Sequence, residues 1–339
     1  MSMQGDASAA KSLSDLIEGF WTTQVLGTAV ALGITDELAD GPRPHTDIAY
    51  SVEADPGCVL RVLRALQSLG VCRSARDASF ELTAKGRLLC ADTPGSMRGR
   101  ALFASGMLWN LFGDLATVIR TGLPTRQQPT GRDGFNQLAA NPGLAAMHQA
   151  MVESSISAVA AAADACDFGN YPRVLDVGGG YGGALTALLQ RNPKMTGDVF
   201  DLGYLSRDAS KYLSSAGLDQ RARFIGGDFF ETVPSGYDCY LLKYIVHDWD
   251  DAAAVQILRV CAAAARPTGT VVLLERVLPE RITEDDRAIM EVDIAMMIAG
   301  GRERTTEEYR DLLHRAGLRL LCVTPTSSPC SVIHAVVEA

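Results

Sequence analysis

The sequence predicts an α/β protein whose core is a doubly wound, mostly parallel sheet of seven strands, preceded by a smaller helical domain. From Arg173 onward, short apolar runs alternate with helical patterns, which is typical of a sheet covered by helices on both faces. A glycine-rich turn follows the first of these runs, at the place where such sheets bind ligands. The chain has 339 residues and is long enough for two domains.

Seven apolar segments account for the predicted sheet. Helical patterns separate the first five segments, as expected for parallel strands that are joined by crossover helices. Two further segments close the chain. The seven predicted strands are 173–177, 197–201, 223–226, 238–243, 270–275, 318–323 and 332–337.

Residues 1–96 are predicted to form the separate helical domain. Asp55 and Pro56 place a capping side chain and a first-turn proline at the start of a helix that runs through Leu69. A polar turn at Arg76 and Asp77 then separates two short strands. Helices followed by a small hairpin indicate a winged-helix-like module. Its first helix has a wide apolar face, which includes Leu13, Leu16, Ile17, Phe20 and Trp21.

Residues 97–339 are predicted to form the second domain. Its first part, 97–168, reads as a helical segment that caps a ligand pocket together with residues 288–300. Methionine and aromatic side chains in such a cap suit a flat aromatic ligand, although ordinary core packing explains several of them equally well. The candidates are Met107, Trp109, Phe112, Met147, Met290, Met296 and Met297.

The charge balance argues against nucleic acid as a partner. The chain carries 31 basic and 40 acidic residues, and its first 92 residues carry eight basic and twelve acidic side chains. Winged-helix modules that bind DNA need a basic surface, because they neutralise phosphates. An acidic module with a wide apolar face is better suited to dimerisation. We therefore expect a homodimer and no binding of nucleic acid.

The remaining composition favours a cytoplasmic protein. The first fifteen residues hold no apolar core of a secretory signal, and no run of about 18 apolar residues predicts a membrane span. Eight cysteines are present without a C-x-x-C pair, and most have apolar neighbours. This is the pattern of reduced, buried thiols rather than of disulfides or a metal framework.

The glycine-rich segment 174–183 reads as a strand, a turn and the start of a helix. Gly178, Gly180 and Gly183 satisfy the spacing G-x-G-x-x-G, which is weak evidence alone and stronger directly after a first strand. Asp176 precedes the first glycine by two residues, and its charge would oppose a diphosphate group. A ligand that carries a cation and no phosphate fits better. S-adenosylmethionine (SAM) has an amino group, a carboxylate and a sulfonium.

Two further acids follow predicted strands. Asp201 ends the second strand, where a carboxylate can accept hydrogen bonds from both hydroxyls of a ribose. Asp228 follows the third strand, where it could accept from an adenine amino group while Phe229 packs on the ring. Each acid taken alone could be a helix cap. Their common position at the carboxyl ends of strands favours a ligand site.

These residues resemble the small-molecule O-methyltransferases that use SAM, a family that includes the plant caffeic acid and isoflavone enzymes and bacterial antibiotic-pathway enzymes. The resemblance covers the carboxyl-terminal half in order and, less specifically, residues 1–95. It is carried by LDVGGG at 175–180, FDL at 200–202, GDF at 227–229, Lys243 with HDW at 247–249, LER at 274–276 and GGRERT at 300–305.

The resemblance implies a Rossmann-like class I methyltransferase domain, a dimerisation domain over 1–96 and SAM as the cofactor. It implies cofactor contacts for Gly178, Asp201, Asp228, Phe229 and Lys243, and Met151 and Ser155 are similar to further contacts of the family. Asp176 is included with this set because of its place before the glycines. Phe229 stands where plant members usually have methionine, and an aromatic ring can still stack on adenine.

His247 is the candidate general base. Most single histidines are structural, but this one follows the fourth strand and faces the expected ligand crevice. A neutral imidazole can remove the proton of a phenol. The resemblance implies that Glu275 and Glu303 flank the imidazole. For Glu303, a charge in the polar turn before a helix capped by Thr305 is the alternative.

The acids after His247 raise the question of a metal. Asp248 is a candidate for holding substrate or shaping the turn, whereas Asp250 and Asp251 are expected to cap the next helix. Together the three acids could imitate a Mg²⁺ site. Such a site would require acids from separate strands, and the family resemblance implies no metal. We therefore expect a metal-free enzyme.

The predicted activity is methylation of a phenolic hydroxyl on an aromatic secondary metabolite, of the phenazine, polyketide or anthracycline type. Three alternatives remain open. One is a relative that binds SAM but performs hydroxylation or decarboxylation. Another is an NAD-dependent oxidoreductase, which Asp176 disfavours. The third is a winged-helix regulator that senses SAM, which the acidic charge disfavours.

Overall fold

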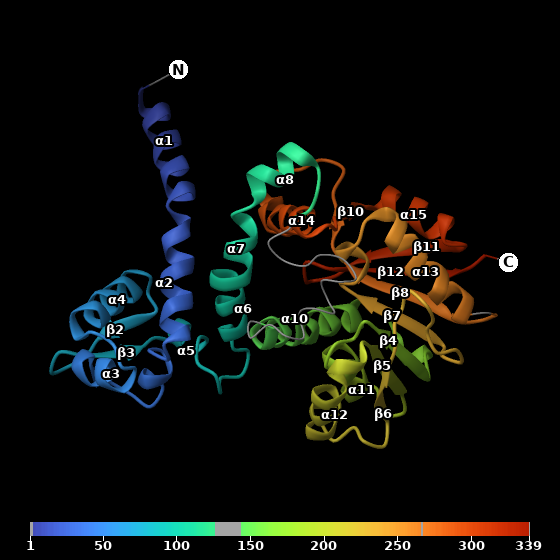
Figure 1. Ribbon diagram of the computed structural model, residues 1–339, viewed down its shortest axis with the longest axis horizontal. Helices are drawn as coiled ribbons and strands as arrows, with labels where there is room; N and C mark the ends of the chain where they lie inside the picture. Colours follow the sequence, from blue (N-terminus) through green and yellow to red (C-terminus); the bar gives the residue numbers. More distant parts are fainter. Residues whose placement is uncertain (1–2, 126–143, 266, 339) are drawn as a thin grey trace. The chain divides into compact units, whose positions relative to one another are not determined.

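The computed structural model describes residues 3–125, 144–265 and 267–338, apart from the side chains of 3–7, 144–151, 153 and 154. Within these limits the chain forms two compact units (Figure 1). The first comprises residues 1–110 with 145–150, and the second comprises 111–144 with 151–339. The segment expected to cap the pocket, 97–168, thus contributes to both units.

The first unit has the predicted order of helices and hairpin. Asp55 accepts a hydrogen bond from Cys58 N (2.8 Å) at the start of α4, and Pro56 occupies its first turn. Leu63 and Leu66 of α4 pack into a core with Ile34. The elements are α1 (Met3–Ile17), α2 (Gly19–Ala31), β1 (Arg43–Pro44), α3 (His45–Ser51), α4 (Pro56–Ser68), β2 (Cys72–Ser74), β3 (Ser79–Leu82) and α5 (Ala84–Arg87), with the strands in the order β1-β3-β2.

The helical segment after residue 97 is divided into several helices. A turn of π-helix at Ala104–Leu108 separates α6 (Arg98–Phe103) from α7 (Trp109–Phe112), and α8 (Leu115–Thr121) and α10 (Leu144–Ala165) follow. In the described part of the chain, no single helix has the length and apolarity needed to cross a membrane. The bent pair Arg98–Phe112 and Leu115–Thr121 passes that test by length and composition only.

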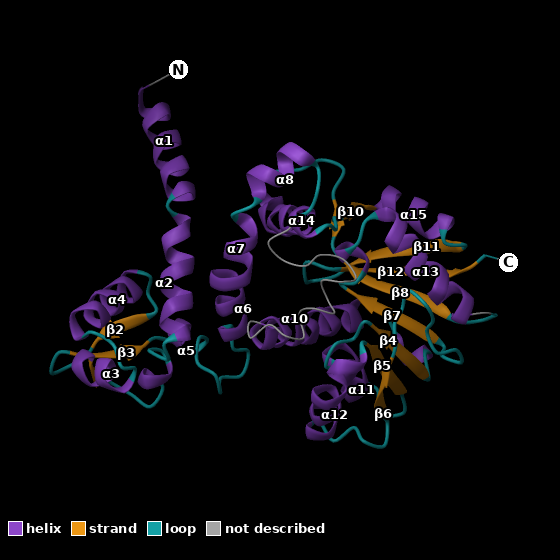
Figure 2. Ribbon diagram, viewed as in Figure 1, coloured by secondary structure: helices purple, strands orange, loops and turns teal. Residues whose placement is uncertain are grey.

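The second unit contains the predicted sheet of seven strands, in the order β11-β12-β8-β7-β4-β5-β6 (Figure 2). All neighbouring strands are parallel except β12, which is antiparallel to both β8 and β11. The prediction of a mostly parallel sheet is therefore confirmed. The strands are β4 (Arg173–Val177), β5 (Thr196–Asp201), β6 (Ala222–Gly226), β7 (Cys239–Lys243), β8 (Thr270–Glu275), β11 (Leu318–Pro325) and β12 (Ser331–Val337).

Alternating side chains of the strands build two cores, one on each face. Leu175 and Leu242 pack with α13 (Asp251–Ala265) and α15 (Thr306–Arg315). Val174 and Leu241 pack on the other face with α10, α11 (Gly183–Arg191) and α12 (Ser206–Ser215). The two faces explain why the central strands read as continuous apolar runs. The sheet is therefore doubly wound, as predicted.

The strand order reverses between β4 and β7, so their carboxyl ends border the crevice where such sheets bind ligands. Four segments follow strands at this edge: the glycine-rich turn after β4, Asp201 at the end of β5, the turn after β7 and Glu275 at the end of β8. A short parallel pair, β9 (Val277–Leu278) with β10 (Arg304–Thr305), and α14 (Arg287–Ala299) complete the second unit.

Candidate active site

The turn after β4 has a backbone that only glycine adopts without strain. Gly178, Gly180 and Gly182 have φ values of 71°, 58° and 91°. Gly178 N donates to the carbonyl of Phe200 (2.8 Å), which joins the turn to β5. A Cβ atom at Gly178 would lie 2.5 Å from Ile245 Cδ1, so a larger residue would force Ile245 to shift. The turn therefore packs closely against Ile245.

Asp201 braces this turn from the neighbouring strand. Its Oδ2 accepts from Gly180 N (2.8 Å) and its Oδ1 accepts from Leu202 N (2.7 Å). Burial raises the pKa of this carboxyl to about 6, although both N–H donors oppose the shift. The sequence placed Asp201 at a ligand-binding strand end, and the structure confirms its position there. A ribose contact stays a prediction.

Asp176 lies beneath the turn. It is 1% exposed and accepts a hydrogen bond from Leu185 N (3.2 Å). A Cβ atom at Gly179 would be 2.6 Å from its carboxyl carbon, so the turn passes directly over the carboxyl group. Burial raises its pKa to about 7, against the opposing effects of Leu185 N–H and Lys243. The structure therefore shows Asp176 supporting the turn, and direct ligand contact stays a prediction.

Asp228 and Phe229 follow β6 on the other side of the turn. Asp228 Oδ1 accepts from Phe230 N (2.8 Å). The ring of Phe229 packs edge-to-face against Trp249, with centroids 6.0 Å apart. Its Cε1 atom would lie 3.4 Å from a Cβ atom at Gly178. The structure therefore brings Phe229 to the glycine turn, as an adenine-stacking role requires.

Lys243 connects the sheet to α10. Its Nζ donates to Ser155 Oγ (2.7 Å), and both side chains are buried. Burial lowers the pKa of Lys243 to about 8, although Asp176 and Glu275 act in the opposite direction. Two residues that lie 88 positions apart and were predicted to serve one ligand are thus direct neighbours. The side chain of Met151 lies outside the described residues.

His247 sits in a turn of 3-10 helix (Val246–Asp248) directly after β7 and is 7% exposed. Its Nδ1 lies 2.9 Å from Glu303 Oε1. Because a carboxylate only accepts, Nδ1–H is the donor and the tautomer is fixed. Its Nε2 lies 3.4 Å from Asp248 Oδ1. The structure therefore gathers the predicted base with two of its three predicted acids.

Glu275 lies beside the imidazole and also holds the backbone of the turn. A carboxylate oxygen of Glu275 lies within 4.8 Å of a ring nitrogen of His247. Its Oε1 accepts from the backbone N–H groups of Ile245 (3.0 Å) and Val246 (2.8 Å). The carboxylate thus fixes the backbone that carries His247, and its catalytic role stays a prediction. Its other oxygen, Oε2, is buried without a partner among the described residues.

The acids around His247 change the pKa of its imidazole. Burial favours the neutral form of His247, but Asp248, Glu275 and Glu303 outweigh this effect and raise its pKa to about 9. Burial raises the pKa of Glu275 to about 7 and also raises that of Asp248. The three acids thus favour the charged imidazole, whereas a positive charge bound near the ring would favour the neutral form that acts as a base.

The positions of His247, Glu275 and Glu303 are relevant to the prediction that the site holds no metal. One ligand atom each from His247, Glu275 and Glu303 lies within 4.8 Å of the others, which by distance could hold an ion. However, Glu303 Oε1 accepts from the imidazole, and Glu275 Oε1 accepts from two backbone N–H groups. These contacts occupy one oxygen of each acid, and Oε2 of both is buried without a partner in the described part of the chain, so a metal-free site stays a prediction.

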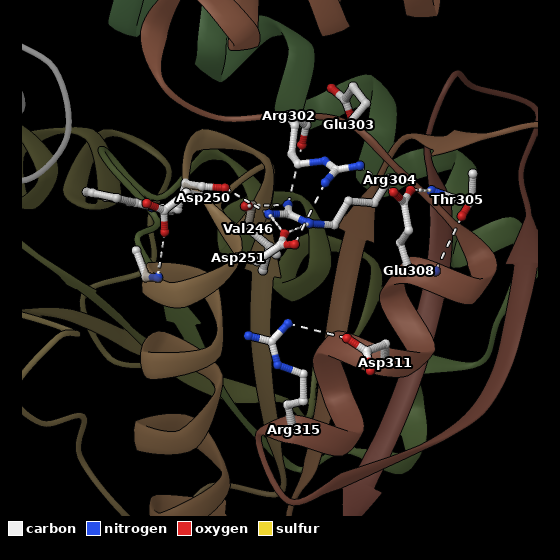
Figure 3. Close-up of polar contacts among 12 residues, drawn as sticks. Val246, Asp250, Asp251, Arg302, Glu303, Arg304, Thr305, Glu308, Asp311 and Arg315 are labelled. Carbon is white, nitrogen blue, oxygen red and sulfur yellow. Dashed lines mark hydrogen bonds and ion pairs between the residues drawn. The ribbon is translucent and has the colours of Figure 1, made fainter. Parts of the chain in front are cut away.

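Two neighbours of the base were missed by the sequence analysis. Tyr244 packs on the imidazole, and a buried arginine, Arg304, donates to backbone carbonyls of the turn that carries His247 (Figure 3). Arg304 lies in the GGRERT segment, which carried the family resemblance. Membership of this motif was the only feature of the sequence that pointed to Arg304. Asp250 caps α13 through Ala253 N (2.8 Å), as predicted, and Asp251 pairs with Arg304.

The candidate pocket residues fall in different parts of the chain. Met290, Met296 and Met297 are half-buried on α14, and Asp293 of the same helix accepts from Glu303 N (2.9 Å). Phe112 also belongs to the second unit, whereas Met107 and Trp109 belong to the first. The side chain of Met147 lies outside the described residues. Contacts of these residues with substrate stay predictions.

Comparison with known proteins identifies both parts of the chain. Residues 112–319 match the O-methyltransferase domain, and residues 14–92 match the O-methyltransferase dimerisation domain. The second match supports a homodimer. The first covers the glycine turn, His247, Glu275 and Glu303, and ends in β11.

Similar proteins cover nearly the whole chain. A phenazine O-methyltransferase of Lysobacter antibioticus is 34% identical and covers 98% of this chain and 97% of its own. The crystal structure of LaPhzM has a TM-score of 0.92 at 33% identity and covers 97% and 99% of the two chains. An O-methyltransferase from neocarzinostatin biosynthesis, solved with SAM and 2-hydroxy-5-methyl naphthoic acid, has a TM-score of 0.79 at 31% identity over 93% and 96%.

One relative carries out another reaction. Aclacinomycin 10-hydroxylase of Streptomyces purpurascens is 32% identical and covers 91% of this chain and 83% of its own. Similarity of sequence therefore extends across more than one chemistry. The domain match and the named methyltransferases nevertheless favour SAM over the nicotinamide cofactor that the glycine spacing left open. The chain belongs to the SAM-dependent O-methyltransferase family.

Proposed function

We propose that this protein transfers the methyl group of SAM to a phenolic hydroxyl of an aromatic small molecule, with His247 as general base. The observation that carries the proposal is the buried contact of 2.9 Å between His247 Nδ1 and Glu303. This contact orients the ring and leaves Nε2 to accept a proton. Asp248, 3.4 Å from Nε2, is proposed to help hold the acceptor hydroxyl.

The proposed chemistry depends on deprotonating the acceptor. A phenol has a pKa of about 10, and its anion is the better nucleophile. His247 Nε2 would take the hydroxyl proton, and Glu303 would stabilise the imidazolium that forms. Glu275 would hold the turn in place through its two backbone contacts. When bound, SAM supplies a methyl group on a sulfonium, and a cation near the ring favours the neutral imidazole.

The residues after the strands fit this cofactor. Gly178 has a positive φ and no side chain, so a ligand can approach its backbone closely. Asp201 is proposed to bind the ribose hydroxyls and Asp228 the adenine amino group, with Phe229 against the ring. Proposed supporting contacts come from Gly178, Asp176, Lys243, Ser155 and Met151.

The proposal also includes the class of the acceptor molecule and the oligomeric state of the enzyme. A related enzyme binds a hydroxynaphthoic acid, and another methylates phenazines, so an aromatic secondary metabolite is the proposed class here. Leu13, Leu16, Ile17 and Phe20 of the first unit are exposed, which supports a homodimer. We place the enzyme in the cytoplasm, with its eight free cysteines reduced.

A methyl-transfer assay tests the proposal. Purified protein is incubated with SAM and a panel of hydroxylated naphthoates, phenazines and anthracyclines, and products are identified by their mass. We expect a product heavier by one CH₂ group, and a loss of about 100- to 10,000-fold in kcat for His247→Ala with unchanged SAM affinity. Full activity of the variant would remove His247 from the role of base.

Hydroxylation is the second candidate, because a 10-hydroxylase is 32% identical to this chain. The two reactions give different mass changes: methylation adds CH₂, whereas hydroxylation adds one oxygen atom and needs O₂ and a two-electron reductant, which a parallel incubation supplies. A product that gains oxygen, with SAM left unconsumed, would replace the first proposal by the second. The presence of His247, Glu275 and Glu303 as a buried group favours methylation.

A further inference from the structure

The segment 301–304 contacts the turn that carries His247 at each of its four residues. A Cβ atom at Gly301 would lie 2.0 Å from the carbonyl oxygen of His247, so the two backbones touch there. Arg302 N donates to the same carbonyl (2.8 Å), and Glu303 accepts from the imidazole (2.9 Å). The fourth residue, Arg304, makes the largest set of contacts.

Arg304 is fully buried, and its guanidinium uses all three nitrogen atoms (Figure 3). One terminal nitrogen donates to Val246 O (3.0 Å) and the other donates to Trp249 O (2.8 Å). Nε and the second terminal nitrogen both donate to Asp251 Oδ1 (3.0 and 2.8 Å). The two carbonyls lie on either side of His247. One planar group thus fixes the start and the end of the turn.

The chemistry of the side chain explains why this position needs arginine. A guanidinium presents its N–H groups in a rigid plane, whereas a lysine ammonium is a single point on a flexible stem. Lysine could reach Asp251 or one carbonyl, but it could not span both carbonyls in fixed geometry. Buried carbonyls without a donor destabilise the conformation that buries them. The turn would then relax, and the ring of His247 would move with it.

The turn held by Arg304 also reaches the cofactor side of the crevice. Trp249, whose carbonyl Arg304 binds, packs edge-to-face on Phe229 at 6.0 Å between centroids. Phe229 in turn borders the glycine turn at Gly178. Arg304 binds only the backbone carbonyl of Trp249 and so fixes the end of the turn, whereas the Trp249 ring is held by its own packing on Phe229 and Phe230. Arg304 fixes the turn without a contact to the imidazole itself.

We infer that Arg304 is a positioning residue for methyl transfer, which holds the turn 246–249 so that His247 Nε2 meets the acceptor hydroxyl. The inference rests on the proposed function. A displacement of about 1 Å at a reacting group can lower a rate by about 100-fold. The effect of losing Arg304 should therefore appear mainly in kcat, and it should depend on the presence of His247.

Arg304→Lys is the test variant, and Arg221→Lys is its matched control. Arg221 also donates to several backbone carbonyls, those of Leu189, Asn192 and Met195 among them, but it precedes β6 at the opposite edge of the sheet. A general effect of losing a guanidinium that binds backbone carbonyls would appear in both variants, with Arg221 half-buried and Arg304 fully buried. The measurements are kcat and KM, the melting temperature and SAM affinity by calorimetry.

We expect Arg304→Lys to lower kcat by about 10- to 100-fold, with SAM affinity within about threefold of wild type. Arg221→Lys should keep its kcat even if its melting temperature falls. In a His247→Ala background, Arg304→Lys should add no further loss, because the residue acts through the imidazole. The slow residual rates are followed with a radiolabelled methyl donor.

Three outcomes would overturn the inference: wild-type kcat in Arg304→Lys, an equal loss with and without His247, or an equal loss in Arg221→Lys. If Arg304→Lys does not fold, Asp251→Asn decides, since it weakens the same contacts from the partner side. It should lower kcat several-fold in the presence of His247 only, and full activity would contradict us. If the wild-type protein transfers no methyl group to any acceptor, the proposed function fails instead.

Discussion

The ring of Tyr244 is stacked on the imidazole of His247, with 5.4 Å between the ring centroids and 29° between the planes. Tyr244 has a φ of 53°, a left-handed conformation that is unfavourable for a bulky side chain. Two cations also lie over the ring, Lys243 Nζ at 4.6 Å and Arg276 Cζ at 4.4 Å. The strained residue thus supports the imidazole and contacts both cations through one ring.

Substitution of Tyr244 tests this support. Tyr244→Phe keeps the ring, so kcat should stay within about twofold of wild type if stacking is what matters. Tyr244→Ala removes the ring, which leaves the imidazole free to tilt, and kcat should fall by about 10-fold or more. Both rates are measured at saturating substrates. A large loss in Tyr244→Phe would show instead that the hydroxyl takes part.

The pH dependence of kcat/KM should identify the coupled group around the base. His247 acts as a base only when neutral, so activity should rise with pH through its pKa, which Asp248, Glu275 and Glu303 raise to about 9. Glu303→Gln removes one of these negative charges. The rising limb should then move to lower pH, while the rate on the plateau falls because the ring is less well oriented.

Glu307→Gln is the control for this profile, since Glu307 is an exposed acid that pairs with Arg310 on α15. Glu307→Gln should leave the rising limb of the kcat/KM profile at the same pH as in the wild-type protein. A profile of Glu303→Gln that coincides with that of the wild type would show that the limb belongs to another group.

The strand ends could be predicted from the sequence because they depend on local pattern. The apolar runs predicted most ends of the seven strands to within about two residues. The positions of the glycine turn, Asp201 and Glu275 followed, because each lies at or directly after the end of one of these runs. The helix cap at Thr305 was also predicted from a local pattern. The structure contains this cap, with Glu308 as the second residue of the capping box (Figure 3). Such features need only neighbours in sequence.

The features that were missed depend on segments that meet only in the fold. Arg304 binds carbonyls 55 and 58 residues earlier in the chain, and no periodicity marks an arginine as buried. The sequence placed Asp176 before the turn but did not show that the turn passes over its carboxyl group, which is possible because Gly179 lacks a Cβ atom. It placed Glu275 beside the imidazole but did not show that Glu275 accepts from two backbone N–H groups.

The hydrogen bond between Lys243 and Ser155 gives a prediction for cofactor binding. Ser155→Ala removes an acceptor from a buried ammonium, and hydrogen bonds to charged groups contribute about 1.5–3 kcal/mol. The pKa of Lys243, already lowered to about 8 by burial, should fall further. We expect weaker SAM binding by calorimetry, most strongly just below pH 8, where the amine of the wild type is still charged and that of the variant is not. Ser215→Ala on α12 should leave the affinity unchanged, and an equal effect there would contradict the prediction.

Gly301→Ala tests the close approach beside the base. The added Cβ would lie 2.0 Å from His247 O and 2.6 Å from Asp248 C, both of which are backbone atoms that cannot rotate away. The turn must therefore shift, and we expect kcat to fall by about 100-fold together with a lower melting temperature. Gly19→Ala is the control, because its Cβ would meet nothing within 4 Å and alanine favours helix there. Wild-type kcat in Gly301→Ala would mean that the turn tolerates displacement, and the tight packing of 301 on 247 would then have no bearing on catalysis.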